Sequence, residues 1–240
     1  MNPRPVTRIA MWSGPRNIST AMMRSWENRP DTVVVDEPFY AAYLARTGLD
    51  HPARDEVIAA QPTDPDEVVR RLTSDDSAPV HYTKHMTHHI DETLPMDWVA
   101  GFRNVLLIRD PVEVVASYVR SRESCEPDDI GLLQQVPLLE ALPADTPVID
   151  AGDFLRDPEA HLRWLCDWLA IPFTELMLQW PPGLRDSDGV WAPHWYDAVA
   201  RSTGFEPWRP RQVDLSTHDA AVAEACRPAY DALRARRLQL

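Results

Sequence analysis

The chain of 240 residues is poor in glycine, cysteine and basic side chains. It has 8 glycines and 3 cysteines, and its 24 Lys and Arg stand against 37 Asp and Glu, which gives a formal net charge of −13. A negative excess of this size opposes general electrostatic attraction to nucleic acid and to anionic membranes. We therefore expect neither a nucleic acid nor a membrane surface among its partners.

Paired cysteines are also missing, and we expect neither a leader nor a membrane span. Cys125, Cys166 and Cys226 lie far apart without a CxxC pair, which is typical of reduced thiols in the cytosol. The start MNPRPVTR leads directly into a short apolar run. No stretch approaches the roughly 20 apolar residues of a membrane helix. The sequence predicts one cytoplasmic domain over residues 1–240, with a core of the size that its length permits.

The phosphate-binding loop of ATPases is another absence. The motif GxxxxGK[ST] places a Lys before its hydroxyl residue. In the loop 13–18 that place is occupied by Ile18, directly before Ser19. A magnesium–nucleotide site of the usual ATPase kind is therefore disfavoured.

The stretch 9–39 nevertheless has the pattern strand, polar loop, helix, strand. An apolar run over 9–12 precedes the loop, a helical pattern starts at Ser19 and Thr20, and a second strand covers 32–35. Backbone N–H groups at such a helix start can hold an anion. Arg16 adds a positive charge, so the stretch predicts a phosphate or sulfate cradle. The alternative is an ordinary turn in which Ser19 is only an N-cap.

The remaining pattern predicts an α/β protein with a mainly parallel sheet. Further strands are expected over 80–86, 104–110 and 147–150, and helices over 39–46, 67–72, 130–142, 158–169 and 219–240. Residues 48–78 form a helical and loop insertion, for which a solvated connection is favoured over a lid. Residues 172–216 form an irregular, aromatic-rich segment, which either covers the site or covers the edge of the sheet.

Four histidines, His81, His85, His88 and His89, lie within nine positions. His81 and His85 share one face of the predicted strand, as two metal ligands could. No acidic or cysteine partner stands at a recognised ligand spacing. We therefore expect no metal. The alternative role is that of partly buried, hydrogen-bonded histidines.

A second arginine, Arg109, closes the apolar run NVLLI. Asp110 and Pro111 after it are favourable residues for a helix start. One interpretation of Arg109 is an ion pair with Asp110 or Glu113. The other is a phosphate contact, because a guanidinium is a planar fork suited to phosphate.

Both loops resemble motifs of the sulfotransferase family, whose members use 3′-phosphoadenosine 5′-phosphosulfate (PAPS). The loop GPRNISTAMMR resembles the 5′-phosphosulfate loop, with Asn17 and Ile18 in place of the usual Ser-Gly pair. Arg109-Asp110-Pro111 followed by Ser117 resembles the 3′-phosphate motif RDPxxxxxS. The late Arg-Lys-Gly stretch of many members is absent. The resemblance implies a P-loop NTPase-like three-layer αβα fold and PAPS bound by Gly14, Pro15, Arg16, Asn17, Ile18, Ser19, Thr20, Arg109 and Ser117.

The resemblance offers two candidates for the catalytic base, and Arg16 as the group that neutralises the leaving phosphate. Glu37 matches the catalytic Glu of some members, including those that act on protein tyrosine. His85 lies in Lys84-His85-Met86, which is similar to the Lys-Thr-His-Leu segment of cytosolic sulfotransferases, where His is the base. We favour Glu37. No metal is needed for this chemistry.

The run DGVWAPHWY resembles a segment of a bacterial sulfotransferase-like subgroup. The predicted function is transfer of a sulfuryl group from PAPS to a hydroxyl or amine of a small organic acceptor. The alternatives are a nucleotide-dependent kinase on the same fold and a non-catalytic nucleotide-binding protein. The predicted acceptor site comprises Glu37, Phe39, His85, His88, His89, Trp191, His194 and Trp195. The sequence does not define an oligomeric state.

Overall fold

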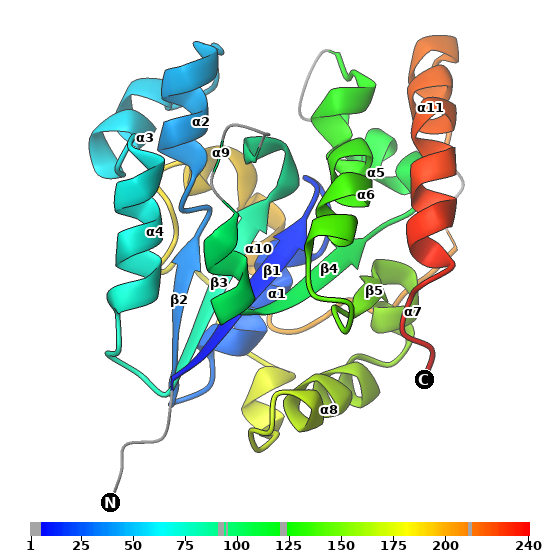
Figure 1. The fold of residues 1–240 in the computed structure, drawn as a ribbon. Coiled ribbons are helices and arrows are strands. Elements are labelled where there is room, and N and C mark those ends of the chain that lie inside the picture. Colours follow the sequence, from blue (N-terminus) through cyan, green and yellow to red (C-terminus); the bar gives the residue numbers. More distant parts are fainter. Residues whose placement is uncertain (1–5, 91–93, 95, 121–123, 211–212) are drawn as a thin grey trace, which may run out of the picture.

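The computed structural model describes residues 6–90, 94, 96–120, 124–210 and 213–240, and its centre is one parallel sheet (Figure 1). The strands run in the order β2-β3-β1-β4-β5, and every pairing is parallel. Their bounds are β1 (Thr7–Ser13), β2 (Thr32–Asp36), β3 (Val80–Met86), β4 (Arg103–Ile108) and β5 (Val148–Asp150). Because all strands point the same way, the loops that follow them meet at one edge of the sheet. The predicted parallel α/β sheet is confirmed.

Helices cover both faces of this sheet. The α-helices are α1 (Ser19–Glu27), α2 (Tyr40–Thr47), α3 (Arg54–Ala60), α4 (Pro65–Ser74), α5 (Pro111–Tyr118), α6 (Leu132–Ala141), α7 (Ala151–Arg156), α8 (Pro158–Trp168), α9 (Ala192–Trp195), α10 (Asp197–Arg201) and α11 (Thr217–Arg234). Short 3-10 helices are η1 (Thr87–His89), η2 (Asp97–Gly101), η3 (Pro127–Ile130) and η4 (Glu175–Met177). No helix of the described part of the chain is long and apolar enough to cross a membrane.

Side-chain alternation along β1 divides the core into two layers. Ile9 and Met11 pack with residues of α1 and α8, whereas Ala10 and Trp12 pack with residues of α4, α5, α6 and α11. All four of these β1 side chains are fully buried. In Figure 1, α5, α6 and α11 lie together on one side, and α8 lies apart from them. The result is the three-layer arrangement of helices, sheet and helices.

Residues 48–78 contain short helices, and some of their apolar side chains are buried. The segment contains α3 and α4, whose Val57, Val68 and Leu72 are buried. Val68 and Leu72 are four positions apart, so they share one face of α4, and both join the core layer that contains Trp12. The spacing of these residues is a packing signal that the acidic composition of the segment concealed.

The late segment over 172–216 is fastened to the sheet by buried polar contacts. Arg24 of α1, which is fully buried, pairs with Asp188 at 2.6 Å. Tyr196 donates a hydrogen bond of 2.6 Å from its hydroxyl to Asp36 at the end of β2. Charged groups are costly to bury without partners, so these contacts fix where the segment crosses the sheet edge.

Candidate active site

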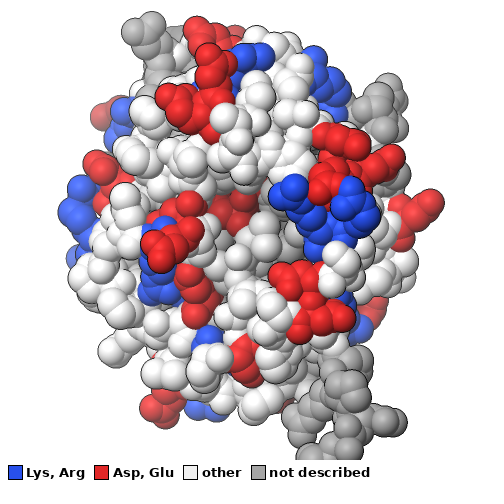
Figure 2. Space-filling view, turned by 90° about the vertical axis from the view of Figure 1, so that its left-hand side faces the viewer, with Lys and Arg blue, Asp and Glu red and all other residues white. Residues whose placement is uncertain are grey.

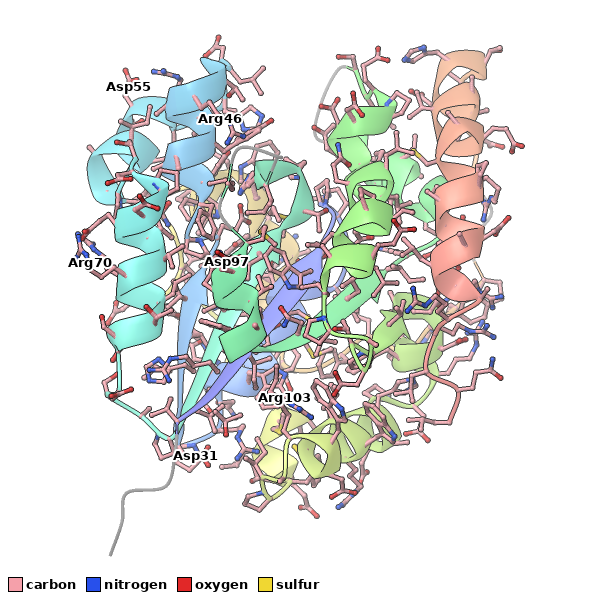
Figure 3. All side chains as sticks on the ribbon, in the orientation of Figure 1. Asp31, Arg46, Asp55, Arg70, Asp97 and Arg103 are labelled. Atoms are coloured by element: carbon pink, nitrogen blue, oxygen red, sulfur yellow. The ribbon has the colours of Figure 1, made fainter. Side chains whose placement is uncertain are left out.

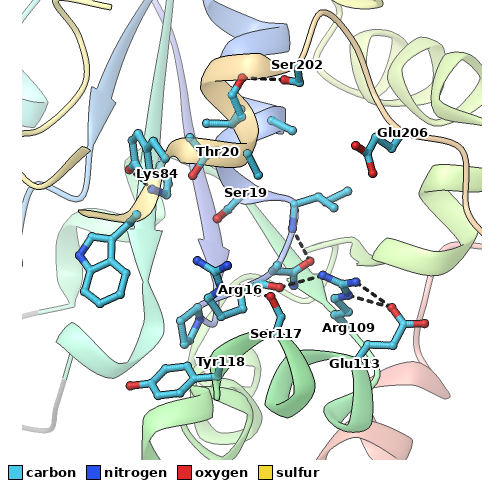
Figure 4. Close-up of a pocket in the computed structure, with 18 of the residues that line it drawn as sticks. Arg16, Ser19, Thr20, Lys84, Arg109, Glu113, Ser117, Tyr118, Ser202 and Glu206 are labelled. Carbon is cyan, nitrogen blue, oxygen red and sulfur yellow. Dashed lines mark hydrogen bonds and ion pairs between the residues drawn. The ribbon is translucent and has the colours of Figure 1, made fainter. Parts of the chain in front are cut away.

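A cavity of about 490 Å³ opens at the edge where the strands end (Figure 4). Its walls come from the loop after β1, from the β4–α5 corner, from α2 and η1, and from the late segment. The face shown in Figure 2 has acidic side chains spread over it and basic ones in separate patches. The walls of the cavity thus bring loops that are far apart in the sequence together into one site.

The loop after β1 presents an uncapped helix start to this cavity. Residues 15–21 line it. Ile18 occupies the N-cap position of α1, and no side chain caps the helix. Helices α4, α5, α8 and α11, by contrast, each begin at an Asp or Ser that accepts from a backbone N–H. Because Ser19 is the first helical residue, the alternative that it is only an N-cap is wrong. An uncapped start offers its N–H groups to an anion.

Gly14 and Asn17 hold this loop in place. A Cβ atom at Gly14 would overlap the carbonyl oxygen of Ile130, so the close approach of η3 requires glycine. Gly14 itself is not among the described residues that line the cavity, so what the structure supports for it is a packing role. Asn17 donates to the Leu107 carbonyl at 3.0 Å and accepts from the Ile18 N–H at 2.8 Å. The Ile18 amide is therefore already occupied.

The two segments that carry Arg16 and Arg109, each predicted to bind a phosphate group, meet in the structure. We call them the two arginine corners. The Arg16 Nε atom donates to Ser117 Oγ at 3.1 Å, and Arg109 donates to the Arg16 carbonyl at 2.9 Å (Figure 4). Arg109 also forms the expected ion pair with Glu113, at 2.9 Å, and still lines the cavity. Burial lowers the pKa of Arg16, and the nearby positive charges of Arg120 and Arg109 lower it further. Three cations this close favour an anion between them.

Glu37 lies at the opposite side of the cavity, directly after β2. Its backbone has φ = +42°, a left-handed value that side-chain-bearing residues rarely adopt. Gln61 supports this turn by donating to the carbonyls of Asp36 and Glu37, each at 3.3 Å. Burial raises the pKa of the Glu37 carboxyl, the Asp36 charge raises it further, and Lys84 opposes the change. A carboxylate with increased proton affinity is suited to act as a base.

His85 lies outside the described lining of the cavity, so its position gives no support to its predicted role at the acceptor site. Lys84 and Met86 line the cavity, but His85 between them does not. Its ring stacks on Trp12 at a centroid distance of 4.4 Å, and its Nε2 lies 2.8 Å from Thr83 Oγ1. Burial lowers the pKa of His85 to about 3. The histidine has a core environment, as neighbouring strand residues point to opposite faces.

The predicted acceptor residues divide into two groups. His88, His89 and Trp195 line the cavity together with Glu37. Phe39 and Trp191 are buried outside the described lining, and His194 is exposed on α9. For these three residues the predicted contact with an acceptor has no support from their positions in this structure.

Several lining residues were not predicted as site residues. They are Tyr40, His51, Lys84, Tyr118, Arg120, Tyr196 and Arg209. Lys84 precedes the predicted residue His85 in the sequence, and Tyr196 follows the predicted residue Trp195. Arg120 and Arg209 follow no motif in the sequence. Within the described residues, no group of three or more His, Cys, Asp or Glu is arranged to hold a metal ion.

Comparison with known proteins gives matches over nearly the whole chain. A family model described as "Sulfotransferase domain" matches residues 7–237. Two Arabidopsis thaliana proteins, branched-chain-amino-acid aminotransferase-like proteins 1 and 2, are 40% and 37% identical to it over 235 and 232 residues. Each match covers 94% of this chain and 41% of the relative, so the chain spans less than half of the length of these relatives.

Solved structures show the same fold at low sequence identity. The sulfotransferase domain from the curacin biosynthetic pathway has a TM-score of 0.59 at 18% identity and covers 93% of this chain and 98% of its own. A sulfotransferase from Alicyclobacillus acidocaldarius has a TM-score of 0.56 at 13% identity, with 98% of both chains covered. These likenesses establish the three-layer α/β architecture.

Proposed function

Because the chain belongs to the sulfotransferase domain family, we propose that it moves a sulfuryl group from PAPS to a hydroxyl or amine of a small organic acceptor. The observation that carries this proposal is that two corners suited to bind phosphate groups meet in one cavity. Arg16 and the uncapped start of α1 form one corner, and Arg109 with Ser117 forms the other. Glu37 lines the same cavity and provides a carboxylate base.

The residues present fit the two phosphate groups of the donor. The N–H groups of the α1 start, together with Ser19 and Thr20, would hold the 5′-phosphosulfate, and Arg16 would neutralise it. Arg109 and Ser117 would hold the 3′-phosphate. Arg120 and Arg209 line the same cavity and add positive charge where the late Arg-Lys-Gly stretch is absent.

PAPS supplies an activated sulfuryl group with a phosphate as its leaving group. In-line transfer of such a group depends on positioning and on stabilising charge, as in phosphoryl transfer. Arg16 and the α1 amides stabilise the negative charge that grows on the 5′-phosphate. Glu37 takes the proton from the attacking hydroxyl or amine. The pKa of its carboxyl is raised, so it holds a proton more tightly than an ordinary glutamate, as a general base should. We propose that no metal takes part.

The acceptor side of the cavity is aromatic and contains the buried imidazole of His89. Tyr40 stacks on His89 at a centroid distance of 4.7 Å and an interplanar angle of 9°. Burial lowers the pKa of His89 well below its ordinary value, and so do nearby histidines and Lys84. His89 is therefore uncharged at neutral pH. These rings support a small organic molecule as the acceptor, and we propose neither a nucleic acid nor a membrane as a partner.

We place the protein in the cytoplasm as one domain over residues 1–240. Cys125, Cys166 and Cys226 are all free and buried. Free thiols are the usual state in a reducing compartment. Burial raises the pKa of Cys125 to about 12 and that of Cys166 to about 11, so these thiols stay protonated and unreactive.

The function is tested with sulfur-35-labelled PAPS and a panel of small alcohols, phenols and amines, in buffer with EDTA. The proposal predicts a labelled product and one PAP (3′-phosphoadenosine 5′-phosphate) released for each transfer. Glu37→Gln is the matched variant, because it keeps the size of the side chain and removes the base. Binding of PAP without transfer to any acceptor would instead indicate a non-catalytic nucleotide-binding protein. Dependence on magnesium and ATP would indicate a kinase.

A further inference from the structure

Lys84 has three hydrogen-bond partners in the wall of the cavity. Its Nζ atom donates to Asp36 Oδ1 at 2.9 Å, to Glu37 Oε1 at 2.8 Å and to the Tyr196 hydroxyl at 2.5 Å. The side chain is 1% exposed. An ammonium group has three N–H donors. All three are therefore used within the protein.

Asp36 ties this lysine to the late segment. Its Oδ2 accepts from the Tyr196 hydroxyl at 2.6 Å and from the Gly189 N–H at 3.2 Å, while its Oδ1 accepts from Lys84. Trp191 donates to the Tyr196 hydroxyl at 3.2 Å and fixes its position from the other side. The contacts join the end of β2 and the strand β3 to Gly189, Trp191 and Tyr196 of the late segment.

We propose that Asp36, Lys84 and Tyr196 form a positioning network that aims the Glu37 carboxylate and sets its proton affinity, and that Lys84 does not contact the transferred group. The inference rests on the proposed role of Glu37 as the base. A lysine with every donor occupied has none left for a sulfuryl oxygen, whereas it is well placed to hold one oxygen of Glu37 and leave the other for the acceptor. Asp36 and Tyr196 keep the lysine in this position.

Charge within the network is unbalanced. Together with Glu37, the network contains one ammonium group and two carboxylates, all of them buried. The groups that face Glu37 are Lys84 from β3, Asp36 from β2, the Tyr196 hydroxyl from the late segment through Lys84, and His89 of η1, whose Nε2 lies 4.0 Å from Glu37 Oε2. His89 is neutral because its burial lowers the pKa of its ring. The Asp36 and Lys84 charges therefore act on the proton of Glu37 in opposite directions.

The test is a pH titration of the Glu37 carboxyl by carbon-13 NMR in protein labelled at the glutamate side-chain carboxyls. The Glu37 signal is assigned by its absence from Glu37→Gln. We expect Asp36→Asn to lower the titration midpoint and Lys84→Met to raise it, each by about one pH unit, because the first removes a nearby like charge and the second removes the opposite charge that contacts Glu37. If one variant is recovered unfolded, the other decides, since each has its own predicted direction.

Asp188→Asn is the matched control. It removes another buried carboxylate from the late segment, but that carboxylate pairs with Arg24. It should weaken the fold and leave the Glu37 midpoint unchanged. Midpoints that stay fixed in both network variants, or that move in the same direction, would overturn the inference. Because the titration needs neither donor nor acceptor, it decides the network even if labelled PAPS gives no product and the proposed function fails.

Discussion

At the residue scale, Glu37 combines a left-handed backbone with a buried carboxyl. Its φ of +42° is supported from outside by Gln61, and its side chain by Lys84. Strained, buried ionisable residues are found preferentially at functional sites, where the fold sustains a local cost. Glu37 is therefore the position at which we expect a substitution to affect activity and stability in different ways.

Replacing Glu37 with Gln should lower kcat by about 10²- to 10⁴-fold, the usual contribution of a general base. PAP affinity should change little, since the arginines and the α1 start remain. The measurement is initial rates together with calorimetric titration of PAP. His85→Ala should lose stability instead, because the ring is stacked on Trp12. An unimpaired Glu37→Gln enzyme beside a folded, inactive His85→Ala enzyme would reverse the assignment.

The stability of Glu37→Gln relative to the wild type should increase as the pH rises. Burial raises the pKa of Glu37 in the folded state above its unfolded value. The folded state therefore binds the proton more tightly, so the stability that protonated Glu37 contributes is present at low pH and is lost as the pH rises through the folded pKa. Thermal unfolding of both proteins between pH 4.5 and 9 should show the advantage of Glu37→Gln growing with pH. A constant difference over this range would argue against the raised pKa.

At the element scale, the segment 48–78 supports the site from outside the sheet. Gln61, at the C-terminal end of α3, donates to two carbonyls of the turn that carries Glu37 and accepts from the Ala41 N–H at 3.3 Å. Gln61→Ala should lower kcat about tenfold, at roughly 1 kcal/mol per neutral hydrogen bond. PAP affinity should stay the same. Gln134→Ala on α6 is the control, since its side chain bonds only the Asp128 carbonyl among the contacts described. Equal effects of the two variants would contradict a role for Gln61 at the site.

A second prediction concerns the close packing of the loop after β1 against η3, at Gly14. Gly14→Ala places a methyl group against the Ile130 carbonyl, and overpacking of this kind costs about 1–3 kcal/mol. Gly101→Ala is the control, because nothing lies within 4 Å of the added atom. Denaturant unfolding should show a clear loss of stability for the first variant and almost none for the second. A Gly14→Ala protein as stable as the wild type would show that the loop is free to move away from η3.

Two arginines at opposite ends of β4, Arg109 and Arg103, allow a test of the proposed phosphate contact of Arg109. Arg109 follows the carboxyl end of β4, whereas Arg103 lies at its other end near α8 (Figure 3). Arg103 donates to the Trp168 carbonyl at 3.0 Å, far from the cavity lining. Arg109→Lys should weaken PAP binding about tenfold, because a point charge replaces a planar fork. Arg103→Lys should leave PAP binding unchanged, and an equal loss in both variants would contradict the assignment.

At the scale of the whole molecule, the sequence predicted what local patterns determine. The apolar run ending at Arg109 and the Asp110-Pro111 helix start are local signals, and the structure contains both β4 and a capped α5. The orientation of His85 was not accessible in this way. Every residue of β3 is buried, so its side chains show no alternation that would fix which of Lys84 and His85 faces the cavity.

The course of the late segment also escaped prediction, for a tertiary reason. Its path depends on contacts with residues more than a hundred positions away, such as Asp188 with Arg24 and Tyr196 with Asp36. No local pattern encodes such pairs. Residues such as Arg209 therefore became visible as cavity residues only in the folded chain.

The most direct test of the account is calorimetric titration of the wild-type protein with PAP, AMP and magnesium-ATP. PAP carries the 3′-phosphate that Arg109 and Ser117 are proposed to hold, and a hydrogen bond to a charged group contributes about 1.5–3 kcal/mol. We predict that PAP binds about 10- to 100-fold more tightly than AMP, with no dependence on magnesium. Equal affinity for PAP and AMP, or tighter binding of magnesium-ATP, would contradict it.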